Sequence, residues 1–244
     1  MPLGLPLNIP TSVEEVDELC ENGPSIAFVL GEDKLGKPKV YKLMRNLIAT
    51  AVVEAKDVEL GLPEIKEKAW FTLPAIPETL IDKLDTFFRR VDKEHGTESI
   101  VLLTYKPEMK GTENEIEGWG ILVPKQKNTA AHCKYDHESV ADDKEDDEMI
   151  VGTVHSHPGM SAFASHTDHG DQADFDGIHI TFGWSKNSSH TEYHIELQVG
   201  GTHFTLKPEQ AFEAVEETPD FPELEAWMAK VEKASTTSTT TKFS

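Results

Sequence analysis

An amphipathic stretch followed at once by an apolar run constrains the fold of this chain more than any other feature. Between Pro77 and Gly96, apolar residues recur at helical spacing, which predicts a helix with one buried face. The positions of that face are Leu80, Ile81, Leu84, Phe87, Phe88 and Val91. The run Ser99–Tyr105 comes next and is continuously apolar, which is typical of a buried strand. The sequence therefore predicts an α/β fold in which a helix packs on a sheet.

Further strands and helices are predicted on both sides of this unit. The strands are expected at Ser25–Leu30, Val40–Val53, Ile116–Val123, Met149–His155, Ile178–Trp184, His190–Val199 and Thr202–Leu206. Shorter helices are expected at Val13–Cys20, Thr167–Phe175, Pro208–Val215 and Pro222–Lys233. Residues 125–148 are polar and end in the acidic run Asp142–Glu148, which is typical of a solvated loop.

These elements divide the chain into three expected parts. Residues 1–72 form a small β-rich N-terminal lobe, and residues 73–215 form the main domain, a mixed β-sheet flanked by helices. Residues 216–244 form a C-terminal helix and a disordered Ser/Thr-rich tail. We find no catalytic constellation in the N-terminal lobe.

Composition excludes several classes of partner. The 244 residues carry a net charge of −21, which disfavours nucleic acid and anionic membranes because both require cationic surfaces. No apolar run approaches the ~20 residues of a membrane span, and the first residues do not resemble a signal peptide. The two cysteines, Cys20 and Cys133, form no CxxC pattern, which indicates reduced thiols and a cytoplasmic protein.

The chemistry of the chain concentrates in one motif. His155 and His157 end a predicted strand, and side chains two residues apart on a strand point to the same face. The loop that follows is long enough to bring Asp168 to the same point. Two imidazoles and a carboxylate are the three protein ligands of a catalytic Zn²⁺, which leaves a fourth position for water.

A water activated by zinc needs a base that is not itself a ligand. Glu117 opens the predicted strand that contains Gly118 and Gly120, and glycines allow close backbone approach. We therefore expect Glu117 to reach over the metal as the general base. Glu115 shares its strand face and is the next candidate.

The stretch HSHPGMSAFASHTD fits the signature His-x-His-x7-Ser-x2-Asp of the JAB/MPN (JAMM) metallopeptidases, and IEGWGILV resembles the glutamate-bearing strand of that family. The resemblance covers about residues 75–210, and within the family the chain is most similar to the bacterial and phage-type members. It implies that His155, His157 and Asp168 bind Zn²⁺, that Glu117 acts as general acid/base, and that Ser165 stabilises the oxyanion. A second interpretation of Ser165 is a helix N-cap.

The resemblance implies a zinc metallopeptidase that hydrolyses an amide or isopeptide bond in a protein or peptide, with a ubiquitin-like C-terminus as one substrate. Two alternatives remain open because fold and motif do not fix a substrate. One is a non-catalytic JAB/MPN interaction scaffold, and the other is a phage-associated hydrolase of another amide. Neighbouring genes for ubiquitin-like and E1-like proteins would favour the zinc metallopeptidase, and neighbouring tail genes would favour the phage-associated hydrolase. The sequence leaves open the oligomeric state, the role of the N-terminal lobe, and whether the acidic loop at residues 136–148 gates the site.

Overall fold

The structure is a computed structural model that describes residues 26–32, 38–45, 47–55, 67–165, 168, 170, 175–186, 188–214 and 220–234. The helix expected at Val13–Cys20, most of the helix expected at Thr167–Phe175, and the Ser/Thr-rich tail lie outside these residues. In the part that the structure describes, no helix is long and apolar enough to cross a membrane.

A six-stranded mixed sheet carries the centre of the molecule, with strand order β13-β12-β11-β10-β6-β7. Strands β10 and β11 run parallel, whereas the other neighbours run antiparallel. The bounds are β6 (Ile100–Tyr105), β7 (Trp119–Leu122), β10 (Met149–Pro158), β11 (Gly177–Trp184), β12 (Glu192–Val199) and β13 (Thr202–Leu206). The predicted α/β class, a mixed sheet flanked by helices, is confirmed.

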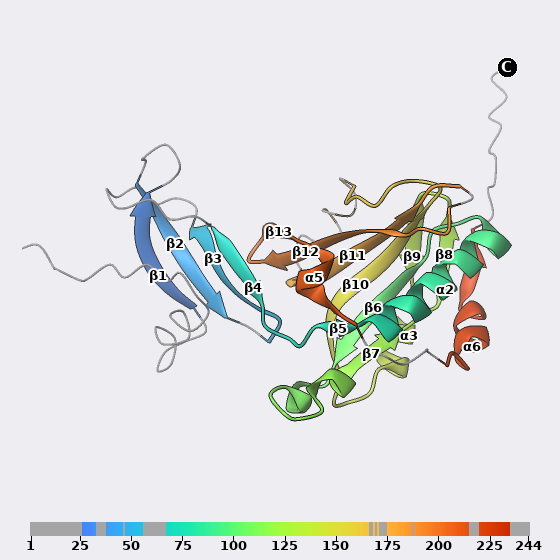
Figure 1. Cartoon of the computed structure of the whole chain (residues 1–244), viewed down its shortest axis with the longest axis horizontal. Coiled ribbons are helices and arrows are strands. Elements are labelled where there is room, and N and C mark those ends of the chain that lie inside the picture. The colour runs from blue at the N-terminus through green and yellow to red at the C-terminus, as the bar shows by residue number, and fades with distance from the viewer. Residues whose placement is uncertain are drawn as a thin grey trace, which may run out of the picture.

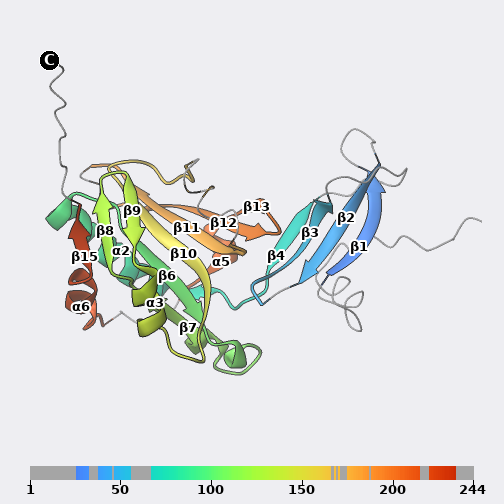
Figure 2. The ribbon, with the colours of Figure 1, turned by 180° about the vertical axis from the view of Figure 1, so that it is seen from behind.

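Helix α2 (Glu78–His95) covers one face of this sheet, in front of it in Figure 1 and behind it in Figure 2. Its buried residues Ile81, Leu84, Phe87, Phe88 and Val91 belong to the predicted apolar face. Phe88 packs on Phe182 of β11, with ring centroids 5.2 Å apart. Pro77 immediately precedes the helix, and Gly96 ends it in the left-handed conformation, φ 62°, as the sequence predicts.

The N-terminal strands form a separate antiparallel sheet in the order β1-β2-β3-β4. They are β1 (Ile26–Glu32), β2 (Pro38–Arg45), β3 (Ala49–Ala55) and β4 (Lys68–Phe71). The single strand predicted at Val40–Val53 is wrong, because Arg45 pairs with Thr50 and the chain reverses between them. Ile48 hides this turn in the sequence, since it is apolar and is buried in the central core. The divisions at residues 72 and 215 stay predictions.

The segment predicted as a polar loop at residues 125–148 contains regular structure instead. It holds the hairpin β8 (Gln126–Thr129) and β9 (His132–Tyr135), then α3 (His137–Asp143). Gln126 and Asn128 are buried and bonded to each other, Nδ2 to Oε1 at 2.7 Å. Hydropathy reads such polar positions as exposed, although a satisfied hydrogen bond lets them be buried.

The two C-terminal helices are shorter than predicted. Helix α5 (Pro208–Ala211) gives way to β14 (Phe212–Glu213), which pairs with β5 (Ile76–Pro77). Helix α6 (Leu224–Met228) is followed by β15 (Val231–Lys233), which pairs with β8 and completes the sheet β15-β8-β9. In both cases pairing with a distant strand overrides the local helical preference.

Candidate metal centre

Strand β10 carries two histidines on one face, at the end where it leaves the sheet. His155 and His157 are 7% and 4% exposed. Val154, the residue before His155 on β10, belongs to the hydrophobic core on the other face. Ser156, between the two histidines, accepts a hydrogen bond from Ser99 N at 3.1 Å and donates its own N–H to Ser99 O at 3.0 Å. These bonds fix the backbone that presents both imidazoles.

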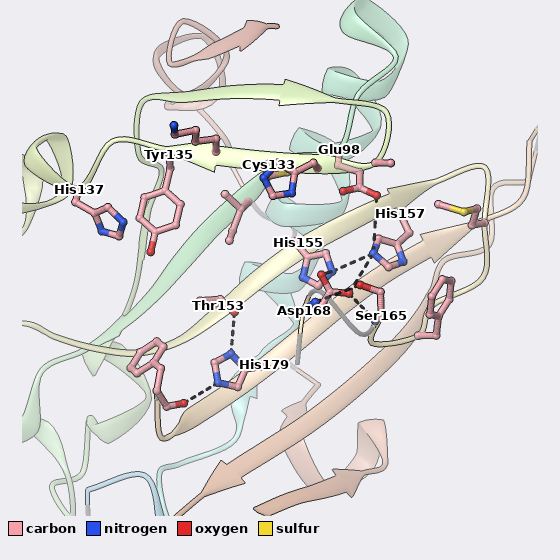
Figure 3. Close-up of a pocket in the computed structure, with 17 residues that line it drawn as sticks. Glu98, Cys133, Tyr135, His137, Thr153, His155, His157, Ser165, Asp168 and His179 are labelled. Carbon is pink, nitrogen blue, oxygen red and sulfur yellow. Dashed lines mark hydrogen bonds and ion pairs between the residues drawn. The ribbon is translucent and has the colours of Figure 1, made fainter. Parts of the chain in front are cut away.

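The segment after β10 turns back over the sheet and supplies the carboxylate. Gly159 adopts φ 76°, a left-handed value that favours glycine. Asp168 then accepts a hydrogen bond from Ser165 N at 2.6 Å and donates its own N–H to Ser165 Oγ at 3.2 Å. This reciprocal pair holds the Asp168 side chain toward the histidines (Figure 3).

The three side chains converge on one point. His155 Nε2 lies 3.1 Å from His157 Nε2, and Asp168 oxygens lie 3.5 Å from His155 Nε2 and 3.7 Å from His157 Nε2. A tetrahedral zinc with bonds of about 2.0–2.1 Å places its ligand atoms ~3.3 Å apart. The donor set and its spacing therefore fit zinc. Among the described residues, no other group of three or more His, Cys, Asp or Glu side chains converges in this way.

The protonation states also suit a cation. Burial, with a smaller contribution from His155, lowers the pKa of His157 to about 4, so its imidazole is neutral at pH 7. Burial opposes ionisation of Asp168, but hydrogen bonds from His155 and Ser165 outweigh it and hold the pKa of this carboxyl below its usual range. A neutral imidazole and an ionised carboxylate are the forms that bind metals.

Residues 82–196 match the family described as prokaryotic homologs of the JAB domain. These residues form a JAB-type domain. The match begins within α2 and ends within β12, so it contains His155, His157, Ser165 and Asp168. No curated protein matches the chain. The JAB family includes hydrolases, and many of its prokaryotic members are non-catalytic.

A glutamate that the sequence analysis missed lies beside the candidate metal ligands of the JAB domain. Glu98 joins α2 to β6, is 7% exposed, and places Oε1 3.9 Å from His157 Nε2. Its N–H donates to Thr129 O of the hairpin at 3.0 Å. Burial, and secondly the charge of Asp168, raises the pKa of Glu98 to about 8. An acidic residue directly before a buried strand was the available signal.

The assignment of Glu117 as general base is wrong in its geometry. Glu117 is exposed and lies in a 3₁₀ turn, Glu115–Gly118, rather than in the strand predicted at Ile116–Val123. The turn directly precedes Trp119 of β7. Trp119 pairs with Tyr105 of β6, and Tyr105 pairs on its other side with Met149, the first residue of β10. His155 is six residues farther along β10, or ~20 Å. Glu115, the second candidate, lies in the same turn.

The remaining predicted site residue, Ser165, lies in the pocket of the JAB domain together with Glu98, His155, His157 and Asp168. Its hydroxyl accepts from Asp168 N, as an N-cap does, and retains its own proton for donation. The capping interpretation and the oxyanion interpretation are therefore compatible. His166 and His169 lie outside the described residues.

Proposed function

We propose that the JAB domain is a zinc-dependent hydrolase of an amide or isopeptide bond. The observation that carries this proposal is the convergence of three zinc-type ligands with a buried, non-ligand carboxylate, Glu98, 3.9 Å from His157. A scaffold that only binds partners has no need for such a set, and burying it without function costs stability. The complete set is our reason for preferring a hydrolase to the non-catalytic alternative.

His155, His157 and Asp168 would hold the metal. When bound, zinc supplies a Lewis acid and makes water nucleophilic at neutral pH. Glu98 would hold the proton of the attacking water and pass it to the leaving amine, the role of a general acid/base. Without a metal, burial raises the pKa of Glu98 to about 8. A bound cation would lower this pKa toward neutral pH, because a neighbouring positive charge favours the ionised carboxylate. Such a pKa suits a group that both accepts and returns a proton.

Ser165 completes the proposed machinery. Its hydroxyl proton is available to the oxygen of the scissile carbonyl as negative charge develops there, and donors aimed at that position often give the largest catalytic effect. The hydrogen bond that Ser165 Oγ accepts from Asp168 N fixes the direction of the hydroxyl. The same residue thus orients one ligand and stabilises the oxyanion.

The proposed substrate is a protein or peptide, with the C-terminus of a ubiquitin-like protein as the first class to test. The net charge of −21 favours basic protein partners over nucleic acid or membranes. A cytoplasmic location belongs to the proposal, since Cys133 carries a free thiol and reducing compartments preserve thiols. The alternative, a phage-type hydrolase of another amide, would differ from this proposal in its substrate but would use the same metal centre.

The test is hydrolysis of a ubiquitin-like C-terminal fluorogenic amide and of a mixed peptide panel by the zinc-loaded chain. We expect turnover that a chelator abolishes and that Glu98→Gln reduces by two to four orders of magnitude, while Glu117→Gln retains it. Zinc-loaded protein that hydrolyses nothing in the panel, or equal turnover in Glu98→Gln, counts against the proposal.

A further inference from the structure

The pocket of about 760 Å³ that contains the metal centre continues along β10 beyond it. Thr153 precedes His155 by two residues on the same strand face, so its side chain lies ~7 Å from the metal ligands. His179 of β11 is the register partner of Thr153. In Figure 3, Thr153 and His179 lie on one side of β10 away from His157, and Tyr135 lies across from them.

The polar atoms on the β11 side are already bonded within the protein. His179 Nε2 lies 3.0 Å from Phe175 O, and a carbonyl only accepts, so Nε2 carries the proton. Thr153 Oγ1 lies 2.8 Å from His179 Nδ1 and donates to it, because burial keeps this imidazole neutral by lowering its pKa to about 4. What His179 offers to the pocket is therefore an uncharged aromatic surface, next to the Phe175 ring at 5.5 Å.

The opposite wall is formed by β9. Cys133 and Tyr135 of this strand are half-buried, whereas His132 and Lys134, which also line the pocket, are exposed to solvent. Ile100, the first residue of β6, also lines the pocket. Burial, followed by the charges of Glu98 and Asp168, raises the pKa of the Cys133 thiol, which keeps it neutral as well.

The carboxylates that line the described pocket, Glu98 and Asp168, lie at the metal end, and its lysine, Lys134, is exposed to solvent. The other end is lined by aromatic and internally bonded polar side chains. We propose that this end, the distal subsite (Tyr135, Thr153, Phe175 and His179), binds a large uncharged side chain of the substrate next to the scissile bond. A charged side chain there loses its hydration without gaining a partner. The proposal rests on the proposed function, because it assumes that the metal centre holds the bond.

Hydroxamates test the subsite without knowledge of the substrate, because they anchor on zinc and project a chosen group. The zinc-loaded full chain is titrated with acetohydroxamate, 3-phenylpropionohydroxamate and the monohydroxamate of succinic acid. The two longer compounds reach the ~7 Å to Thr153 with a phenyl or a carboxylate. We expect the phenyl compound to bind at least ~10-fold tighter than acetohydroxamate, and the carboxylate compound to gain nothing.

Matched variants assign the gain to the subsite. Tyr135→Ala and, independently, Phe175→Ala should reduce the phenyl preference to about 2-fold or less while acetohydroxamate affinity and zinc content stay as in wild type. Lys127→Ala, on the exposed face of β8 and outside the pocket lining, should keep the full preference. The subsite is refuted if acetohydroxamate binds but phenyl adds nothing, or if both wall variants keep the preference. A chain that binds neither zinc nor acetohydroxamate refutes the proposed function instead.

Discussion

Gly183 is the position where one added methyl group should damage the metal centre without touching a ligand. It is the register partner of His157 on β11, and the segment that leads to Ser165 and Asp168 passes directly over it. A Cβ at Gly183 would lie 2.2 Å from Ala162 N and 2.4 Å from Ser161 C. Both are backbone atoms, so no side-chain rotation relieves the clash.

The required movement sets the size of the effect. Ordinary van der Waals contact begins at about 3.4 Å, so the segment must move by about 1 Å. Metal–ligand distances tolerate ~0.2 Å, and disturbing a residue that orients a ligand costs ~10–100-fold in metal affinity. We therefore expect Gly183→Ala to bind zinc 10–100-fold more weakly and to unfold ~1–3 kcal/mol more easily, as overpacked cores do.

Zinc affinity is measured by competition with a chromophoric chelator, and stability by urea unfolding of the metal-free protein. Gly170→Ala is the matched control, because it lies in the segment after β10 and a Cβ there meets nothing within 4 Å. We expect the control to match wild type in both assays. Wild-type zinc affinity in Gly183→Ala would refute the reasoning that this glycine positions the Asp168 segment.

Three further predictions concern the base, its support and pH. Glu98→Gln keeps one zinc but loses ~10²–10⁴-fold in turnover, as followed by elemental analysis and a fluorogenic assay, whereas Glu117→Gln keeps both. Gln126→Met leaves unpaired the Ile100 N–H and C=O that the amide now bonds, each at 2.9 Å, so urea unfolding should show a loss of about 2–4 kcal/mol; an unchanged midpoint contradicts this. Burial lowers the pKa of His179 from its ordinary value of 6.5 to about 4 in the folded protein. Between pH 6.5 and pH 4 the unfolded chain therefore binds a proton at His179 that the folded chain does not. The metal-free protein should thus keep this contribution to its stability above pH 6.5 and lose it as the pH falls to 4. An equal loss in His179→Gln would show that this histidine is not the cause.

The parts of the site that the sequence predicts are those with local patterns. His155 and His157 share a face because strand side chains alternate, and Asp168 returns to them within a short loop. Ser165 is tied to Asp168 by bonds that span only three residues. Helix α2 was equally predictable, since its apolar spacing and its ends at Pro77 and Gly96 are written within twenty residues.

The proposed base, Glu98, was missed because its position depends on strand pairing. Glu117 precedes a strand of the same sheet, yet the antiparallel register of β7 on β6 and of β6 on β10 puts it at the wrong end. Glu98 reaches the site because β6 starts beside His155, which pairs with Ile100. Register over fifty residues is not encoded in a local pattern.

The hairpin β8–β9 was missed for a different physical reason. Its buried positions include Gln126 and Asn128, whose burial is compensated by hydrogen bonds to Ile100 and to each other. Binary patterning assumes that polar residues face water. A strand whose inner face is polar, such as β8, is therefore predicted as a loop, and with it the partner strand β9, which lines the pocket, is missed.

The measurement that tests the central claim most directly is zinc per chain, by elemental analysis of protein purified without added metal. The comparison is between wild type, His155→Ala, and His190→Ala as an exposed control. The account predicts about one zinc in wild type and in the control, and none in His155→Ala. Zinc that persists in His155→Ala, or a wild-type chain that stays empty after reconstitution, would contradict it.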